Sequence, residues 1–440
     1  MKALPVPVIP FLRRLLTGAR RSRHAVPNIN YVPALVGFLV LAVATFSVVF
    51  LSPFQWPPVS SSSLFSNAGA GCDMTRGEWV RDPSARPYYT NATCAFIEGY
   101  QNCMTHGKPS LEFLQWRWRP DGGCGGELGR RFDAARFFRL VRGKSILFVG
   151  DSLASSHVRS LVCTLSQTES PEERSPPQRS GEGFEHWRFP AHAFTVAFFW
   201  TPFQVTWRLT RGPPEAVGPE RQGEVFAGPT DIHLDEPDQR WVPAAMDHDY
   251  VVVSASHWFA RPAVYYLGGR VAGCHGHHDG CGAMANATKL KPEHAQRAAF
   301  RTVLGKLAGM EGLKRTTVIL RTVAPTHYEN GGWFDGGECT ATQPADPEDP
   351  VEMAEPEGEF YRAQVEEFAA AEEIARRKND VRMRMMDVTK MMLRRPDGHP
   401  DRYGHGAGEH EGFEIDCLHW CLPGPIDVWN DMLLHIIAGR

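Results

Sequence analysis

A long apolar segment near the start of the chain is the feature that most constrains its fold. Residues 25–71 contain no Lys, Arg, Asp or Glu, and within them residues 32–51 read VPALVGFLVLAVATFSVVFL. About 20 consecutive apolar residues are enough for a helix to cross the hydrocarbon core of a bilayer. The segment therefore predicts one transmembrane helix, which separates a short leading tail from the rest of the 440-residue chain.

The charges on either side of this segment predict its orientation. No basic residue follows it before Arg76, whereas six precede it: Lys2, Arg13, Arg14, Arg20, Arg21 and Arg23. Because positively charged flanks remain in the cytosol, we expect residues 1–31 to be a cytosolic tail and the chain beyond residue 51 to be lumenal. A cleaved signal peptide is the alternative. It fits less well, because the apolar run is longer and begins later than in such peptides.

The cysteines agree with a lumenal location. All ten lie from Cys72 onward, and an even number of cysteines in one compartment indicates a disulfide framework. Two N-glycosylation sequons, at Asn91 and Asn286, lie on the same side of the membrane segment. The folded part of the chain is therefore expected in the secretory pathway, with its disulfide connectivity left open.

Shifts in composition divide the lumenal part. Residues 52–71 are rich in Ser, Pro and Gly and predict a flexible stem. Residues 72–124 are dense in Cys and aromatic residues, with little helical periodicity, which indicates a small disulfide-stapled subdomain. Residues 125–440 form the main domain. The formal net charge of −3 and the absence of a basic cluster from the folded region argue against a nucleic-acid partner.

The main domain alternates apolar runs with helical patterns. Residues 145–149 (SILFV) form a continuous apolar run, as expected of a strand buried on both faces. Further strands are expected at residues 250–254, 317–320 and 383–388, and helices at residues 132–144, 153–165, 292–310, 357–378 and 425–438. This alternation predicts an α/β fold with a mainly parallel sheet and flanking helices.

The first of these strands leads directly to a possible nucleophile. Gly150, Asp151 and Ser152 follow the strand, and a helical segment follows them. Ser152 would then lie at the carboxyl end of a parallel strand and at a helix N-terminus, where backbone N–H groups can stabilise an oxyanion. The alternative is that Ser152 is only a helix cap. The three residues alone do not decide between these readings.

A second motif near the C-terminus could supply the base that a serine hydroxyl needs. Asp416 stands three residues before His419, so its carboxylate can bond one imidazole nitrogen while the other faces a nucleophile. For this motif alone, a structural histidine in a disulfide-bound loop is the alternative. The order of the two motifs, one after the first core strand and one before the last helix, predicts an acyl-transfer site built from Ser152, His419 and Asp416.

Other clusters offer further binding residues. The loop CHGHHDGC at residues 274–281 could bind zinc by its composition, but a Cys274–Cys281 disulfide is expected in a lumenal chain, and we expect no metal. His157 is expected to be a helix-surface or packing residue. Five tryptophans near these motifs could stack on sugar rings or pack in the core: Trp116, Trp118, Trp258, Trp333 and Trp420.

Several motifs occur together in one known family: CDMTRGEWVRDPSARPYYTNATC, WRWRPDGGC, FVGDSLASSHVRSLVC, APTHYENGGWFDGGEC, RPDGHPDRYGH and DCLHWCLPGPIDVWNDML. With them, the chain from Cys72 onward resembles the plant trichome-birefringence-like family of polysaccharide O-acetyltransferases. The resemblance implies an SGNH-hydrolase-like fold, with Ser152 as the nucleophile and Asp416 and His419 as the orienting acid and the base. It also implies a Golgi membrane protein that acetylates a cell-wall polysaccharide. Residues 256–281 look most like the branch that acts on xyloglucan.

The sequence departs from the family pattern in two places. Ser155 and Ser156 stand where many members have an Arg-Asn pair, and residues 254–258 read SASHW where many have Asn-x-Gly-His-Trp. An Asn at that position would be a natural oxyanion donor, so the third donor is left open. The residues that we consider for contact with the oxyanion or the substrate are Gly150, Asp151 and Ser256.

We therefore predict a double displacement. An acetyl donor, acetyl-CoA or another carrier, acylates Ser152, and a sugar hydroxyl activated by His419 then takes the acetyl group. No cofactor is expected to be bound. A polysaccharide acetylesterase with the same three residues is one alternative. A non-catalytic wall-polysaccharide-binding protein, with Ser155 and Ser156 as signs of lost activity, is another.

Overall fold

The computed structural model describes residues 73–121, 132–173, 184–209, 229–276, 281, 288–313, 315–332, 336–378, 381–405 and 415–439. The expected cytosolic tail, membrane helix and stem lie outside these residues, as do Cys72, Cys124, Asn286 and Trp333. Within the described residues, no helix is long and apolar enough to cross a membrane. Residues Asn67–Arg440 form one compact unit, so the expected Cys-rich subdomain and main domain are packed together.

A seven-stranded sheet lies at the centre of this unit. In spatial order its strands are β13 (Arg382–Met386), β12 (Thr317–Arg321), β9 (Tyr250–Ser254), β3 (Ser145–Gly150), β6 (Phe194–Trp200), β5 (Phe184–Phe189) and β4 (Glu172–Glu173). The strands from β13 to β6 are parallel, and β5 and β4 add an antiparallel edge. The mainly parallel sheet predicted from the four apolar runs is therefore confirmed, and β6 and β5 were not predicted.

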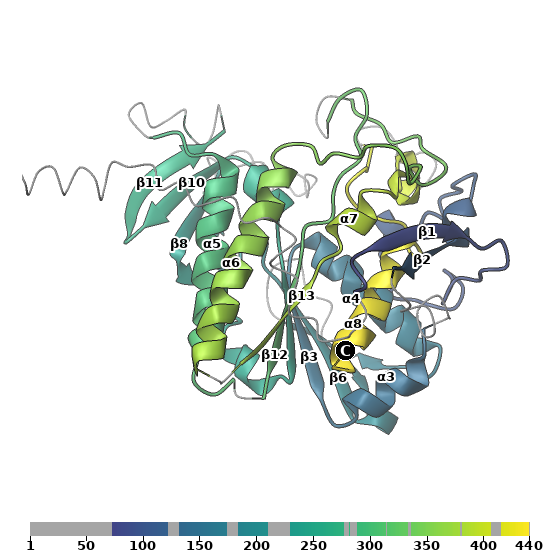
Figure 1. Cartoon of the computed structure of the whole chain (residues 1–440), viewed down its shortest axis with the longest axis horizontal. Helices are drawn as coiled ribbons and strands as arrows, with labels where there is room; N and C mark the ends of the chain where they lie inside the picture. Colours follow the sequence, from purple (N-terminus) through teal and green to yellow (C-terminus); the bar gives the residue numbers. More distant parts are fainter. Residues whose placement is uncertain are drawn as a thin grey trace, which may run out of the picture. The chain divides into compact units, whose positions relative to one another are not determined.

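Helices cover both faces of this sheet (Figure 1). On one face lie α3 (Ala134–Val141), α4 (Ser152–Ser166) and α8 (Val428–Ile437), and on the other α5 (Pro292–Gly309) and α6 (Glu357–Lys378). A short helix, α7 (Thr389–Met392), follows β13. Strand β3 contributes Ile146 and Phe148 to the first core, and Leu147 and Val149 to the second. Because successive side chains of a strand point to opposite faces, its continuous apolar run buries both sides of the sheet.

A second sheet of four strands was not predicted from the sequence. Its spatial order is β11 (Arg270–His275), β10 (Ala263–Leu267), β8 (Thr230–Pro237) and β7 (Val205–Leu209). It packs on α5, where the Thr302 hydroxyl donates to the Leu234 carbonyl over 2.7 Å. Ile232 and Leu234 of β8 are buried in the same core as α5, whereas Asp235 and Glu236 of that strand are exposed. Such short, half-buried strands give a much weaker pattern than β3.

The N-terminal subdomain is attached to the main domain by disulfides. Strands β1 (Gly77–Arg81) and β2 (Trp116–Pro120) pair antiparallel, and two 3₁₀ turns lie between them, η1 (Gly99–Gln101) and η2 (Glu112–Gln115). Both described bridges of this subdomain, Cys94–Cys163 and Cys103–Cys421, end in the main domain. The other two cysteines of this subdomain, Cys72 and Cys124, lie outside the described residues, so a bridge that closes the subdomain on itself stays a prediction.

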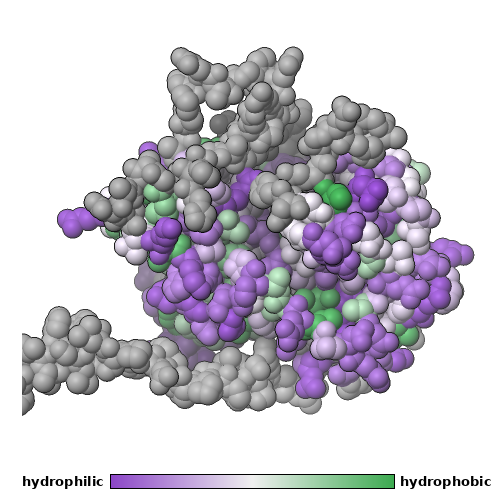
Figure 2. All heavy atoms as spheres, turned by 90° about the horizontal axis from the view of Figure 1, so that it is seen from above, coloured by the Kyte–Doolittle hydropathy of each residue, from purple (hydrophilic) through white to green (hydrophobic). Residues whose placement is uncertain are grey.

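The visible surface carries few apolar groups. Figure 2 shows that the described residues on this face are mostly hydrophilic, with hydrophobic residues in small separate patches.

Asn91, the described sequon residue, is exposed, and its Nδ2 donates to Thr105 Oγ1 over 3.0 Å. Asn91 is therefore accessible, and its glycosylation stays a prediction.

Gly150 ends β3 where no side chain fits. A Cβ atom added there would lie 2.0 Å from the Ser254 carbonyl oxygen and 2.8 Å from Ala154 Cβ. We predict that Gly150→Ala destabilises the fold, since overpacking costs about 1–3 kcal/mol and more where backbone must move. Gly305→Ala is the control, because a Cβ there meets nothing within 4 Å. Gly305 lies in the middle of α5, so Gly305→Ala should raise the free energy of unfolding by about 0.5–1 kcal/mol. Chemical denaturation with intact disulfides tests this, and equal midpoints for the two variants would contradict it.

Candidate active site

The turn between β3 and α4 presents Ser152 at the start of a helix. Asp151 is the N-cap residue, and its Oδ1 accepts hydrogen bonds from the amides of Leu153 at 3.0 Å and Ala154 at 3.4 Å. Its Oδ2 accepts from the amide of Ser256 at 3.2 Å. The interpretation of Ser152 as the helix cap is therefore wrong. Asp151 caps α4, and the hydroxyl of Ser152 is available for another partner.

The loop that carries His419 is ordered by one carboxylate. Asp416 Oδ1 accepts hydrogen bonds from the amides of Leu418 at 3.0 Å and His419 at 2.8 Å, while Oδ2 lies 2.8 Å from His419 Nδ1. The main chain of Asp416 also pairs with that of Asp401 in both directions, at 2.9 and 3.1 Å. A single side chain thus fixes both the backbone turn and the plane of the imidazole.

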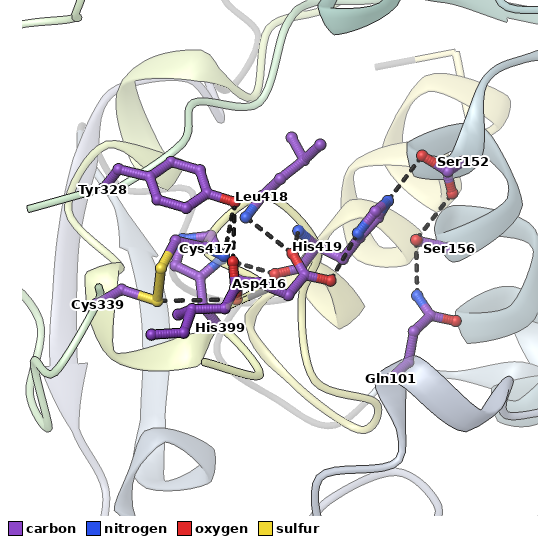
Figure 3. A network of polar contacts seen from close by, with 11 residues as sticks. Gln101, Ser152, Ser156, Tyr328, Cys339, His399, Asp416, Cys417, Leu418 and His419 are labelled. Carbon is purple, nitrogen blue, oxygen red and sulfur yellow. Dashed lines mark hydrogen bonds and ion pairs between the residues drawn. A yellow bond between two sulfur atoms is a disulfide. The ribbon is translucent and has the colours of Figure 1, made fainter. Parts of the chain in front are cut away.

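Ser152, His419 and Asp416 form one hydrogen-bonded chain (Figure 3). His419 Nε2 lies 2.7 Å from Ser152 Oγ. Since the ionised carboxylate of Asp416 can only accept, Nδ1 of His419 carries a proton, and Nε2 is left to accept the proton of the serine hydroxyl. The structure therefore brings together the three residues that the sequence singled out, in the arrangement that a nucleophile, a base and an orienting acid require.

Charge pairing in this site opposes the effect of burial on the pKa values of Asp416 and His419. Burial would raise the pKa of Asp416, but His419 and the amides of His419 and Leu418 bring it below its ordinary value. Burial would likewise lower the pKa of His419, but Asp416, with Asp151 and Glu98, raises it above its ordinary value. The ionised carboxylate thus makes His419 a stronger base than an isolated imidazole.

A buried histidine supports the His419 loop from behind. His399 Nδ1 lies 2.6 Å from the His419 carbonyl oxygen, which can only accept, so Nδ1 carries the proton. Burial, together with His327, holds the pKa of His399 well below its ordinary range, so the ring is neutral. Its Nε2 lies 2.7 Å from Nδ1 of His327. Sequence reasoning did not identify His399, although it lies in the RPDGHP motif that carried the resemblance.

Arg321 is a second residue that the sequence analysis missed. It ends β12, is only 2% exposed, and donates through Nη2 to Ser254 Oγ over 2.7 Å. Burial lowers the pKa of its guanidinium to about 10, against the opposing charge of Asp151, so the group stays cationic at neutral pH. A charged residue directly after the apolar run at residues 317–320 is the sequence signal that could have found it.

The two serines of the SASHW segment, Ser254 and Ser256, each contact a buried charged residue. The hydroxyl of Ser254 accepts from Arg321, and the amide of Ser256 donates to Asp151. Gly150 provides the close approach of β3 to the Ser254 carbonyl. The first amide of α4, that of Ser152, lies at the positive end of the helix, where helix geometry gives it no intrahelical acceptor.

The two serines that replace the Arg-Asn pair of many relatives contact the N-terminal subdomain. Ser156 Oγ donates to the Ser152 carbonyl over 2.9 Å and accepts from Gln101 Nε2 over 2.6 Å. Ser155 Oγ donates to Glu98 Oε1 over 3.1 Å. These serines therefore belong to the contact between α4 and the subdomain.

The structure also describes most of the other residues that the sequence analysis considered. Trp118, Trp420 and His157 are buried, with His157 packed between aromatic rings, whereas Trp116 and Trp258 are partly exposed. The Cys274–Cys281 disulfide is present as expected, and residues 277–280 of that loop lie outside the described chain. Within the ranges that the structure covers, no group of three or more His, Cys, Asp and Glu side chains is placed to hold a metal.

Comparison with known proteins gives clear matches. Residues 130–436 match the GDSL/SGNH-like acyl-esterase family found in Pmr5 and Cas1p, and residues 70–124 match the PMR5 N-terminal domain. Protein trichome birefringence-like 19 of Arabidopsis thaliana is 40% identical over 391 residues, 87% of this chain and 86% of that protein. Xyloglucan O-acetyltransferase 2 of the same plant is 36% identical over 409 residues, 92% of each chain. Xyloglucan O-acetyltransferase 4 of Populus trichocarpa is 38% identical over 366 residues, 83% and 81% of the two chains.

The geometry predicts how Ser152 reacts with a fluorophosphonate, which labels a serine whose proton a base removes. Labelling should fail as the pH drops through the raised pKa of His419, because the protonated ring accepts no proton. Asp416→Asn removes the charge that raises this pKa, so the half-maximal pH should fall, and the maximal rate should fall about 10²- to 10⁴-fold. Mass spectrometry measures the labelling, with Ser152→Ala as the unlabelled control. A half-maximal pH that stays or rises in Asp416→Asn contradicts the assignment.

Proposed function

The chain belongs to the trichome-birefringence-like family, with a main domain of the GDSL/SGNH-like acyl-esterase type, and from this premise we propose that it transfers acetyl groups to hydroxyls of xyloglucan. The observation that carries the proposal is the hydrogen-bonded chain Ser152–His419–Asp416. The likeness of the whole protein to several relatives named xyloglucan O-acetyltransferase supports xyloglucan as the acceptor.

In the first half of the proposed reaction, Ser152 becomes acetylated. Its Oγ attacks the carbonyl carbon of the acetyl donor while His419 Nε2 takes the hydroxyl proton. The oxyanion that forms is stabilised at the N-terminus of α4, where the Ser152 amide is the first donor. His419 then gives the proton to the leaving group, and the carbonyl re-forms as acetyl-Ser152. Asp416 stabilises the imidazolium throughout.

In the second half, a sugar hydroxyl replaces the leaving group. His419 takes its proton as the sugar oxygen attacks the acetyl carbon, and the same proton returns to Ser152 Oγ when the ester to serine breaks. The acetyl group is carried only by the enzyme's own serine. The proposal therefore includes no resident cofactor or metal, and acetyl-CoA or another acetyl carrier supplies the group.

Aromatic side chains at the carboxyl edge of the sheet support a sugar acceptor. Trp200 ends β6 and Trp258 lies just beyond β9, the two strands that flank β3, and their ring centroids are 5.4 Å apart. The guanidinium of Arg261 lies 4.3 Å from the Trp258 ring centroid. Partly exposed indole rings offer flat apolar surface to the C–H face of a pyranose, and a guanidinium offers donors to its hydroxyls. We propose that the acceptor lies along this edge.

We also propose that the protein is a single-pass type II protein of the Golgi membrane with a lumenal catalytic domain. The apolar residues 32–51 and the basic residues before them support this topology. The disulfides of the described domain and the exposed sequon at Asn91 fit an oxidising lumen.

The test is an assay of the 440-residue chain in detergent, with isotopically labelled acetyl donors and deacetylated xyloglucan. Mass spectrometry should find the label on Ser152 without acceptor and on a sugar when acceptor is added. Ser152→Ala should lower transfer by more than about 10³-fold, since the nucleophile is lost. Deacetylated xylan and glucomannan run in parallel test the choice of polymer.

Three outcomes would contradict the proposal in different ways. Release of acetate at the same rate with or without acceptor indicates an acetylesterase. Unchanged polymer acetylation in Ser152→Ala indicates a binding protein. Label on xylan or glucomannan but not on xyloglucan leaves the chemistry standing and replaces the acceptor.

A further inference from the structure

One short segment of the N-terminal subdomain is bonded to both halves of the active site. Cys94 forms a disulfide with Cys163 on α4, the helix that begins at Ser152. Cys103 forms a disulfide with Cys421, which follows His419 in the same loop. The nucleophile and the base are 267 residues apart in the sequence, and the segment Cys94–Cys103 is covalently joined to the element that carries each of them.

Gln101 links the same two elements by hydrogen bonds. Its side chain is fully buried, and Nε2 donates to Ser156 Oγ, which in turn donates to the Ser152 carbonyl (Figure 3). Its main-chain carbonyl accepts from the amide of Leu422 over 2.8 Å, just beyond the His419 loop. Gln101 therefore contacts the helix with its side chain and the loop with its backbone.

The neighbouring residue, Tyr100, contacts the base itself. The ring centroids of Tyr100 and His419 lie 4.8 Å apart at an interplanar angle of 65°, an edge-to-face contact. Burial, followed by the charge of Glu98, raises the pKa of the Tyr100 hydroxyl well above its ordinary value, so the side chain is neutral. The ring of Tyr100 therefore packs against the imidazole, and the side chain of His419 is only 12% exposed.

We propose that Tyr100 is a positioning residue for His419, and that the segment Cys94–Cys103 completes the active site from the N-terminal subdomain. Tyr100 holds the imidazole where Nδ1 faces Asp416 and Nε2 faces Ser152. The main domain alone lacks this contact. The inference rests on the proposed acetyl transfer, because the rate of that reaction is the measurement that depends on the position of His419.

The test uses the 440-residue chain with labelled acetyl donor and xyloglucan. Tyr100→Ala should lower kcat about 10- to 100-fold with little change in KM for the acceptor, since a small misplacement of a catalytic group costs this much. Because burial opposes protonation of His419, loss of the ring should also move the acid limb of the pH–rate profile to higher pH. Tyr100→Phe keeps the ring and should recover most of the rate and the original acid limb.

A matched control exists in the second sheet. Tyr266 of β10 stacks on His233 of β8 with ring centroids also 4.8 Å apart. Tyr266→Ala removes the same side chain from the same kind of contact, and it should leave kcat and the pH profile as in the wild type. A general loss of stability from removing a tyrosine would affect both variants, whereas mispositioning of His419 affects only Tyr100→Ala.

The outcomes separate this inference from the proposed function. Wild-type kcat and an unmoved acid limb in Tyr100→Ala, with Ser152→Ala inactive, overturn the inference and leave the function standing. A wild-type chain without transfer overturns both. If the Cys103–Cys421 bridge fails to form in Tyr100→Ala, the variant Tyr100→Leu is tested in its place, because leucine keeps apolar volume without a flat ring. A lowered kcat in Tyr100→Leu then supports the inference, and a wild-type kcat overturns it.

Discussion

One hydrogen bond joins Ser152 to His419 across 267 residues of sequence, and much of the long-range structure holds its two ends in place. The serine end is fixed locally, because β3 is the middle strand of the seven-stranded sheet and α4 begins directly after it. The histidine end lies in a loop, which has no such support from regular structure. It is held instead by the Asp416 carboxylate, by the pairing of Asp416 with Asp401, and by His399. Two disulfides also fasten this loop: Cys417 is bonded to Cys339, and Cys421 to Cys103.

Two buried carboxylates, those of Asp151 and Asp416, accept hydrogen bonds in different parts of the site. Asp151 caps α4 and binds the Ser256 amide, whereas Asp416 orders its own loop and orients His419. Burial disfavours an ionised carboxylate unless hydrogen bonds and opposite charges compensate. The amides of Leu418 and His419 supply that compensation for Asp416, and the buried guanidinium of Arg321 provides an opposing charge for Asp151. The ionised state of Asp416 that the mechanism needs is therefore built into the fold.

The sequence predicted what short-range patterns determine. The apolar run at residues 145–149 is buried on both faces, so its pattern was unambiguous, and Asp416 and His419 are close enough in sequence for their contact to be inferred. The second sheet was missed because its strands are short and mix buried with exposed residues. Arg321 and Tyr100 were missed because their roles depend on neighbours that are far away in the sequence. Ser155 and Ser156 looked like lost functional residues, yet each contacts the N-terminal subdomain, which only the tertiary structure shows.

The bridge between Cys103 and Cys421, whose partners are 318 residues apart, imposes an order of events on biosynthesis. Cys103 is synthesised 318 residues before Cys421, so its thiol must remain unpaired, or exchange temporary partners, until the later cysteine has been made. The bridge can form only once both cysteines have been made and are in oxidising surroundings. Maturation of the site therefore depends on synthesis of both the N-terminal subdomain and the His419 loop, and a chain that stops before Cys421 lacks this bridge.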